Sequence, residues 1–193
     1  MIIGLTGKVS TGKSFVASCF KKLGASVFDA DFIVHQLYKV DKKIINYVER
    51  NFPDVVNNGK VDRSLLSKYF LMYDQNWQKF ESLVHSAVAH KLRIFLSYEW
   101  NINRKLIVLD IPLLLETKLH LYCDFLVFIH TNRVVQYRRR NIDSEKFKLI
   151  CELQLPTQLK KKLSDCTINA GVNRGHAFLQ VKEIVDFLGS VHL

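Results

Sequence analysis

The stretch Gly7-Lys8-Val9-Ser10-Thr11-Gly12-Lys13-Ser14 decides the fold of this chain. It fits the pattern of glycine, any four residues, glycine, lysine and then serine or threonine, which is the phosphate-binding P-loop. An apolar run at residues 2–5 precedes it, and apolar residues recur at helical spacing after it until Gly24. The motif is therefore predicted to join a strand to the N-terminus of a helix, where unpaired backbone N–H groups and the helix dipole favour an anion.

Each residue type in the loop suits a nucleoside triphosphate. Gly7 and Gly12 permit a tight turn, Lys13 places a cation against the outer phosphates, and the Ser14 hydroxyl can bind the Mg²⁺ that bridges them. The predicted nucleotide-binding residues of this segment are Ser10, Thr11, Gly12, Lys13, Ser14 and Phe15. The motif indicates a nucleoside triphosphate such as ATP, and it leaves the acceptor open.

The composition predicts a packed globule with a basic surface. The chain has 193 residues, 48% of them hydrophobic, and a net charge of +10. Residues 133–162 hold nine Lys or Arg and three Asp or Glu, which is +6 of that total. Such a concentration suits a clamp over polyphosphate, a nucleic-acid patch or a solvated helical face.

Neither a membrane span nor a secretory leader is predicted. No apolar run approaches the length of a span, and the apolar N-terminal residues lack a basic leader. The four cysteines are scattered without a CxxC pair, which favours reduced thiols. We therefore expect a cytoplasmic protein with no membrane partner.

Strand and helix patterns alternate along the chain, which predicts an α/β fold with a doubly wound, five-stranded parallel sheet flanked by helices. The predicted strands are residues 2–5, 26–28, 106–109, 125–129 and 166–168. The nucleotide-binding core is expected to comprise residues 1–31, 104–132 and 163–193. Residues 32–103 show successive helical patterns without a strong strand signal, so they are expected to form a helical insertion, and residues 133–162 a basic helical stretch.

Two carboxylates stand near predicted strand ends. Asp110 directly follows an apolar strand, which is the arrangement of a Walker B residue that holds Mg²⁺. Asp31 follows the second strand and could take the proton of an acceptor hydroxyl. The alternative for either residue is a helix N-cap or an ordinary loop carboxylate.

Two residues of the insertion are weaker candidates. His85 and His90 lie five apart on one predicted helix, so they do not share a face and do not predict a metal pair. His85 alone would more often be a packing or surface histidine. Arg63 follows a turn and could be either a phosphate ligand or a surface residue.

At this point the chain resembles the dephospho-CoA kinase family, P-loop kinases that phosphorylate the 3′-hydroxyl of dephospho-coenzyme A with ATP. The resemblance covers nearly the whole chain. Its matching stretches are 4–7 with 12–14, 28–31 (Phe-Asp-Ala-Asp), 61–63 with Leu66, His85, 109–114 (Leu-Asp-Ile-Pro-Leu-Leu) with Glu116, 123–124, Gln136 with Arg139, Gln154, and 168–169 with Gly171. The Asp-Ala-Asp and Asp-Ile-Pro-Leu-Leu stretches are specific to that family, whereas the P-loop is not.

The resemblance implies a helical coenzyme-binding insertion, a mobile lid over residues 133–162, and roles for individual residues. It implies that Asp31 serves the acceptor hydroxyl, that Arg139 or Arg140 contacts the transferring phosphate, and that Asn169 lies near the adenine of ATP. It also makes Arg63 and His85 candidates near the acceptor.

The implied partners are ATP and dephospho-coenzyme A, with Mg²⁺ as cofactor, no nucleic acid, and a monomer or weak homo-oligomer. The rival functions are another P-loop kinase acting on a nucleoside or nucleotide, and a nucleic-acid-binding regulatory NTPase suggested by the charge.

The loop departs from the family pattern at two positions. Lys8 and Ser10 stand where the family usually has glycine. A positive φ at either position would be strained, and Lys8 could add charge toward phosphate. His85 is followed by Ser86 where the family has proline, and the stretch between Gln136 and Gln154 is short, which leaves the phosphate-contacting arginine open among residues 138–140.

Overall fold

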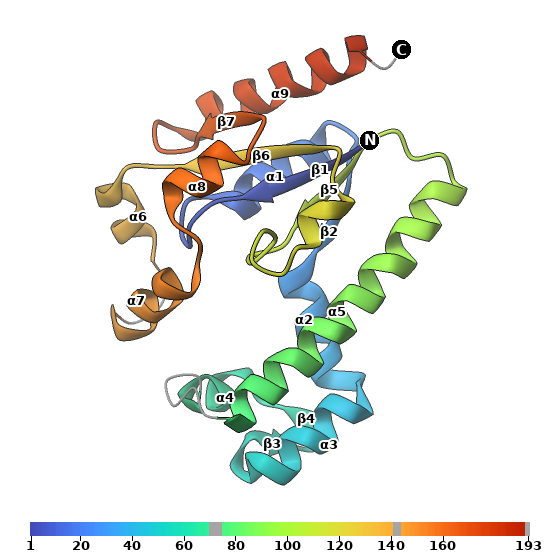
Figure 1. The fold of residues 1–193 in the computed structure, drawn as a ribbon, viewed down its shortest axis with the longest axis vertical. Coiled ribbons are helices and arrows are strands. Elements are labelled where there is room, and N and C mark those ends of the chain that lie inside the picture. Colours follow the sequence, from blue (N-terminus) through green and yellow to red (C-terminus); the bar gives the residue numbers. More distant parts are fainter. Residues whose placement is uncertain (70–74, 141–143, 192–193) are drawn as a thin grey trace. The chain divides into compact units, whose positions relative to one another are not determined.

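The computed structural model describes residues 1–69, 75–140 and 144–191 (Figure 1). The chain divides into two compact units. The first comprises Met1–Asp29 and Tyr98–Leu193, and the second comprises Ala30–Ser97. Residues 133–162, expected to form the lid, belong to the first unit, and positions 141–143 of that stretch lie outside the described residues.

A five-stranded sheet organises the first unit. Its strands are β1 (Ile2–Thr6), β2 (Ser26–Asp29), β5 (Ile107–Asp110), β6 (Phe125–His130) and β7 (Cys166–Asn169). They lie in the order β2-β5-β1-β6-β7, and each neighbouring pair is parallel. The predicted α/β class and all five predicted strands are confirmed.

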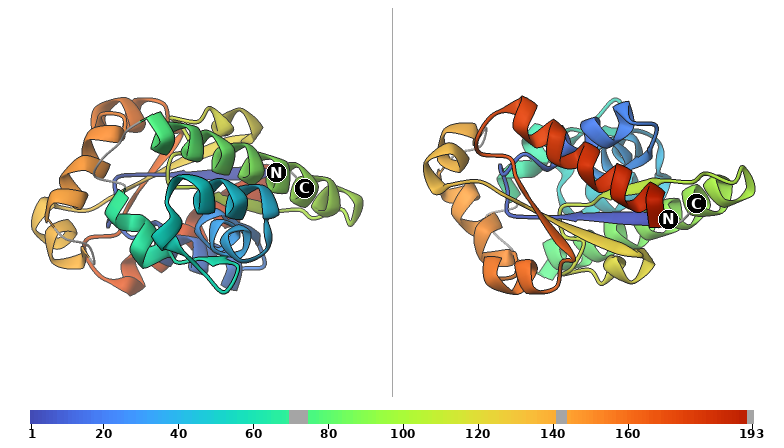
Figure 2. Two further views of the ribbon diagram at one scale, coloured as in Figure 1. Left: turned by 90° about the horizontal axis from the view of Figure 1, so that it is seen from below. Right: turned by 90° about the horizontal axis from the view of Figure 1, so that it is seen from above.

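Helices α1 (Lys13–Lys22) and α9 (Arg174–Val191) pack together against one face of this sheet (Figure 2). The fully buried residues that join strands and helices include Ile3, Leu5, Val16, Phe20, Val108, Val127, Ile129, Ile168 and Val181. Strands β1 and β5 are buried on both faces, which is why they read in the sequence as continuous apolar runs.

Gly24 ends α1 as the sequence predicts. Its φ is 94°, a left-handed conformation that suits glycine. Its N–H donates to the Lys21 carbonyl oxygen, and the Ala25 N–H donates to that of Phe20. This pair of bonds is a Schellman motif, which satisfies the last helical carbonyl groups and turns the chain into β2.

The remaining elements of the first unit follow β5 and β6. They are the 3₁₀ turn η2 (Leu119–Tyr122), α6 (Arg133–Arg139), α7 (Ser144–Leu153) and α8 (Thr157–Lys162). Asn132 begins α6, because its side-chain oxygen accepts a hydrogen bond from the Val135 N–H at 2.8 Å. Figure 1 shows α6 and α7 beyond the carboxyl ends of β1 and β6, the edge at which the P-loop lies.

The second unit is mainly helical. It contains α2 (Ala30–Val40), α3 (Lys42–Asn51), the 3₁₀ turn η1 (Pro53–Val55), α4 (Arg63–Tyr69) and most of α5 (Gln75–Asn101). Its core is aromatic, with Phe52 and Phe80 packed edge to face at 6.3 Å between ring centroids. Asp62 caps the start of α4, since its carboxylate accepts from the N–H groups of Ser64 and Leu65.

The expectation of an insertion without strands is wrong in one place. Strands β3 (Val56–Asn57) and β4 (Lys60–Val61) form an antiparallel hairpin around Asn58 and Gly59. Both turn residues have positive φ, 50° and 68°, as a two-residue type I′ turn requires. The Asn-Gly pair was therefore a hairpin signal, although each strand is too short to show a period of two.

Among the helices that the described residues form, none has the length and apolarity needed to cross a membrane.

Candidate active site

The P-loop connects β1 to α1 in the predicted manner. Gly12 has a φ of 107°, and a Cβ at Gly7 would lie 2.4 Å from the Ile129 carbonyl oxygen, so neither position has room for an ordinary residue. The Lys13 Nζ lies 3.5 Å from the Gly7 carbonyl oxygen, across the loop. The first turn of α1 holds no acidic residue. The helix N-terminus is thus suited to an anionic ligand.

Ser10 is the strained position of the loop. Its φ is 61°, in the left-handed region that costs a non-glycine residue about 1–2 kcal/mol. The predicted strain at this departure from the family pattern is confirmed for Ser10. It is not found at Lys8, whose φ is not positive.

Lys8 does not extend toward the phosphate site. Its Nζ donates to the carbonyl oxygens of Cys151 at 2.9 Å and Gln154 at 3.3 Å, at the carboxyl end of α7. The expectation that Lys8 adds charge toward phosphate is therefore wrong for this structure.

Lid residues bind both backbone groups of Val9. The Val9 N–H donates to Gln154 Oε1 at 3.0 Å, and Gln136 Nε2 donates to the Val9 carbonyl oxygen at 2.7 Å. Gln154 is buried. The sequence offered both glutamines as matches to the family pattern, without a role, and the structure supplies one: they hold the P-loop from α6 and from the segment after α7.

Arg139 and Arg140 differ in position. Arg139 Nη1 lies 3.4 Å from the Thr11 carbonyl oxygen, and a Cβ at Gly12 would lie 3.3 Å from it. Arg140 instead donates to the Tyr137 hydroxyl at 2.6 Å and lies over the Tyr137 ring, 3.6 Å from its centroid. The structure thus brings Arg139 to the P-loop and directs Arg140 to its own helix.

Two carboxylates end neighbouring strands beside the P-loop. Asp110 ends β5, and Asp29 ends β2, where the two residues are paired in register. Leu5 of β1 pairs with Asp110 on its other side. Asp110 is buried and Asp29 is exposed. Parallel strands present such residues to the crevice at their carboxyl ends, where ligands of open α/β sheets bind.

The sequence suggested that Asp31 lies at the end of the second strand, but the structure places it elsewhere. The strand ends at Asp29, and Asp31 lies exposed in the first turn of α2, within the second unit. The helix dipole favours a carboxylate there, which explains the early start of the helix. Its role toward an acceptor stays a prediction.

Asp31 shares its surroundings with another candidate residue. Burial raises the pKa of the Tyr38 hydroxyl to about 12, and the charges of Arg63, Glu81 and Asp31 all act on it. The charges of Asp31 and Arg63 thus both influence the same buried hydroxyl. His85 lies exposed on α5. A basic and an acidic side chain around a buried tyrosine can recognise a polar acceptor, and the roles of Arg63 and His85 stay predictions.

Asn169 ends β7 and has a local structural role. Its side-chain oxygen accepts from the Gly171 N–H at 2.9 Å, and its backbone N–H donates to Gln180 Oε1 at 3.0 Å. Phe15, in the first turn of α1, lies with its ring centroid 5.6 Å from the Arg174 guanidinium. The predicted contacts of Asn169 and Phe15 with the nucleotide are not tested by these bonds.

A buried ion pair, which the sequence did not indicate, supports the lid side of the site. Lys160 Nζ lies 2.7 Å from Glu116 Oε1, and the same oxygen accepts from the Leu155 N–H at 2.8 Å. The Lys160 side chain is 0% exposed. Within the run Lys160-Lys161-Lys162, nothing in the sequence distinguishes the buried lysine from its exposed neighbours.

The two partners respond oppositely to burial. Burial acts to raise the pKa of Glu116, but the hydrogen bonds from Lys160 and the Leu155 N–H lower it overall. Burial lowers the pKa of Lys160, and Glu116 offsets only part of that effect. The lowered pKa of Glu116 contributes stability above its usual value of 4.5, and that contribution is lost as the pH falls through the lowered value.

Lys160→Met is expected to lower the free energy of unfolding by about 3 kcal/mol, because it leaves a partly buried carboxylate without its cation. Urea titration at pH 7 measures the loss. The double variant Lys160→Met/Glu116→Gln should recover most of it, since glutamine still accepts from the Leu155 N–H without a charge. A single variant as stable as the parent would show that the pair makes no net contribution.

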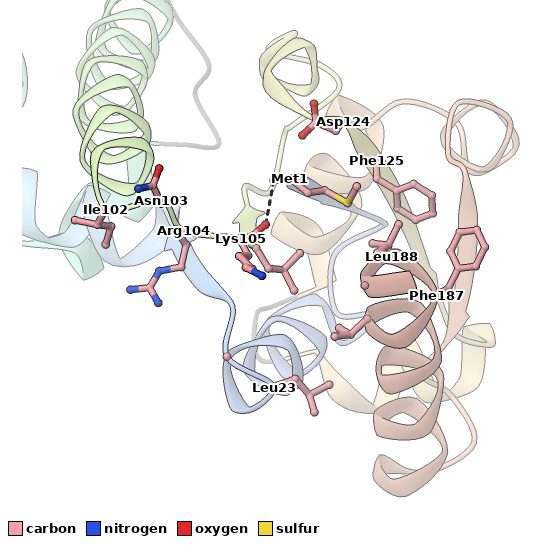
Figure 3. Close-up of a pocket in the computed structure, with 14 residues that line it drawn as sticks. Met1, Leu23, Ile102, Asn103, Arg104, Lys105, Asp124, Phe125, Phe187 and Leu188 are labelled. Carbon is pink, nitrogen blue, oxygen red and sulfur yellow. Dashed lines mark hydrogen bonds between the residues drawn. The ribbon is translucent and has the colours of Figure 1, made fainter. Parts of the chain in front are cut away.

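One pocket of the first unit lies at the opposite edge of the sheet from the P-loop. It has a volume of about 1140 Å³, and its lining includes Met1, Leu23, Lys105, Phe125 and Leu188 (Figure 3). The Met1 amino group donates to the Lys105 carbonyl oxygen within it. Ligands of open parallel sheets bind at the carboxyl ends of the strands, so we assign this pocket no role in the reaction.

The site combines a P-loop that joins a strand to a helix with carboxylates at adjacent strand ends. An arginine lies against the same loop. This combination is typical of a P-loop phosphotransferase. The model of the dephospho-CoA kinase family matches residues 1–174. The chain belongs to the dephospho-CoA kinase family, and it is a kinase whose acceptor is an alcohol group.

Individual relatives agree along the whole chain. The dephospho-CoA kinases of Wolbachia sp. subsp. Brugia malayi and Wolbachia pipientis wMel are 58% and 59% identical over 191 residues, 97% of this chain and 98% of each relative. The solved dephospho-CoA kinase from Campylobacter jejuni superposes with a TM-score of 0.73 at 17% identity, covering 100% of this chain and 98% of that one. At that identity the superposition supports the fold alone.

Proposed function

We propose that the protein transfers the γ-phosphoryl group of ATP to the ribose 3′-hydroxyl of dephospho-coenzyme A, giving coenzyme A and ADP. The observation that carries the proposal is the P-loop beside the Asp29–Asp110 pair, in a chain that is more than half identical to named dephospho-CoA kinases. Incubation of protein, ATP and Mg²⁺ with dephospho-CoA should yield coenzyme A. Transfer to nucleosides or nucleoside monophosphates at a higher kcat/KM would indicate another P-loop kinase.

Within this proposal, the first turn of α1 binds the phosphates through its backbone N–H groups, and Lys13 neutralises charge that develops on the transferred group. Arg139 supplies a second cation from the lid, since its guanidinium already lies against Thr11 and Gly12. Arg140 reaches phosphate only if it leaves Tyr137. Asp31 orients the acceptor hydroxyl and takes its proton.

The residues beside the P-loop fit Mg²⁺. Asp110, Asp29 and the exposed Ser14 hydroxyl offer oxygen ligands, which this hard cation prefers. No group of three or more His, Cys, Asp or Glu side chains suited to a metal occurs among the described residues. That accords with Mg²⁺ in kinases, which takes one or two protein oxygens and the substrate phosphates. When bound, the ion neutralises charge on the phosphates. Ser14 and Asp110 are the proposed ligands.

The proposed setting is the cytoplasm, which the four unpaired cysteine thiols support. The proposed partners are ATP and dephospho-CoA, without nucleic acid or membrane, for a monomer or weak homo-oligomer.

Ligands should protect the lid stretch 133–162 from proteolysis. Closure over the phosphates would order the lid and exclude water, so ATP with a non-reactive acceptor analogue should slow cleavage there. Limited trypsin digestion followed by mass spectrometry measures the rate at each basic site. Cleavage at Lys105, outside the lid, serves as the control, and equal lid cleavage with and without ligands would contradict a lid.

A further inference from the structure

Lys8 binds the carboxyl end of α7 although it belongs to the P-loop. Its ammonium, partly buried, donates to the Cys151 and Gln154 carbonyl oxygens. The last carbonyl groups of a helix lack internal partners and carry a partial negative charge, which a cation stabilises. Helix α7 has no basic residue in its own last turn. The P-loop lysine therefore supplies the charge that the helix itself lacks.

The contact is reciprocal, which makes it more than a surface pairing. The Lys8 side chain donates to the backbone carbonyl oxygens of Cys151 and Gln154, and the Gln154 side chain accepts from the backbone N–H of Val9. One residue further on, the Leu155 N–H is bound by Glu116, whose cation is the buried Lys160. The segment 151–155 is thus held from two sides.

The opposite end of the lid is fixed to the same loop. Gln136 donates to the Val9 carbonyl oxygen, and Arg139 lies within 3.4 Å of the Thr11 carbonyl oxygen. Residues near both ends of the stretch 133–162 therefore contact the P-loop.

We propose that Lys8 is a positioning residue that fixes the carboxyl end of α7 on the P-loop. The contact depends on the long side chain of Lys8, which spans from the loop to the Cys151 and Gln154 carbonyl oxygens. By fixing residues 151–154, Lys8 also holds the Gln154 side chain where it accepts from the Val9 N–H of the P-loop. The consequence for catalysis rests on the proposed kinase function, whereas the anchoring does not.

Hydrogen exchange of the ligand-free protein tests the anchoring. Lys8→Met should speed exchange of the backbone amides of residues 150–155 by about tenfold, the order that one hydrogen bond to a charged group contributes. Amides of β1 and α9 should keep the parent rates, which verifies the fold. Lys161→Met removes an exposed lysine of α8 and should change none of these rates, and Lys8→Arg should restore part of the protection. Unchanged exchange at 150–155 in Lys8→Met overturns the proposal.

Kinetics separate positioning from phosphate binding. A positioning role predicts that Lys8→Met lowers kcat by about tenfold, because Gln154 no longer holds the Val9 N–H of the P-loop firmly, while the Kd for ATP changes less than about twofold. A phosphate contact predicts the reverse, weaker ATP binding with unaltered ligand-free exchange, and would overturn the proposal. Lys8→Gly, which restores the family residue, gives the same test if Lys8→Met does not fold. A parent protein inactive on dephospho-CoA would refute the proposed function and leave the exchange result standing.

Discussion

Lys13→Ala is expected to abolish most phosphoryl transfer while leaving the fold intact. The Lys13 ammonium lies across the P-loop, 3.5 Å from the Gly7 carbonyl oxygen, where the outer phosphates of a nucleotide would lie. Loss of one preorganised charge at the transferred group costs roughly 10²–10³-fold in kcat. Steady-state coenzyme A formation measures it.

The matched control is Lys22→Ala at the other end of the same helix. Lys22 is exposed and lies in the last turn of α1, so its removal changes the net charge equally without reaching the phosphate site. Circular dichroism should show the parent fold for both variants. A folded Lys13→Ala protein with turnover close to that of the parent would remove Lys13 from the mechanism.

The sheet could be predicted because its signals are local. The apolar runs of the five strands, the glycine pattern of the loop and Gly24 after α1 each specify a conformation within a few residues, and all were confirmed. The hairpin at Asn58-Gly59 was missed because two-residue strands carry no periodicity. Its turn residues alone held the information.

The hydrogen bonds and the ion pair that hold the site in place join residues far apart in the sequence. These contacts could therefore not be predicted from local patterns. Lys8 was assigned to phosphate because the loop around it binds phosphate. Its actual partners lie 143 and 146 residues later, at a helix end without a cation of its own. Lys160 is identical in the sequence to two exposed neighbours, and only the approach of Glu116 explains its burial. Asp31 was assigned to the core beside the second strand because the helical insertion was predicted to begin at residue 32, whereas α2 begins at Ala30.

Asp31→Asn is expected to lower kcat by roughly 10²–10⁴-fold, or about 3–5 kcal/mol of barrier, if Asp31 takes the proton of the acceptor hydroxyl. The substitution keeps the size of the side chain and one acceptor oxygen, and it removes the charge and the basicity. Asp31 lies exposed in the first turn of α2, near the Tyr38 hydroxyl on which Arg63 also acts. ATP affinity should change much less than kcat, because Asp31 is assigned to the acceptor and not to the phosphates.

Asp29→Asn is the control that separates the two carboxylates of the Asp-Ala-Asp stretch. Asp29 ends β2 in register with Asp110, so its loss should act through the metal and raise the Mg²⁺ concentration needed for half-maximal rate. Asp31→Asn should leave that Mg²⁺ dependence unchanged at its lower rate. Turnover of Asp31→Asn within a few-fold of the parent would refute the general-base role. A larger loss of kcat at saturating Mg²⁺ in Asp29→Asn would transfer that role to Asp29, the residue that ends β2 in register with Asp110.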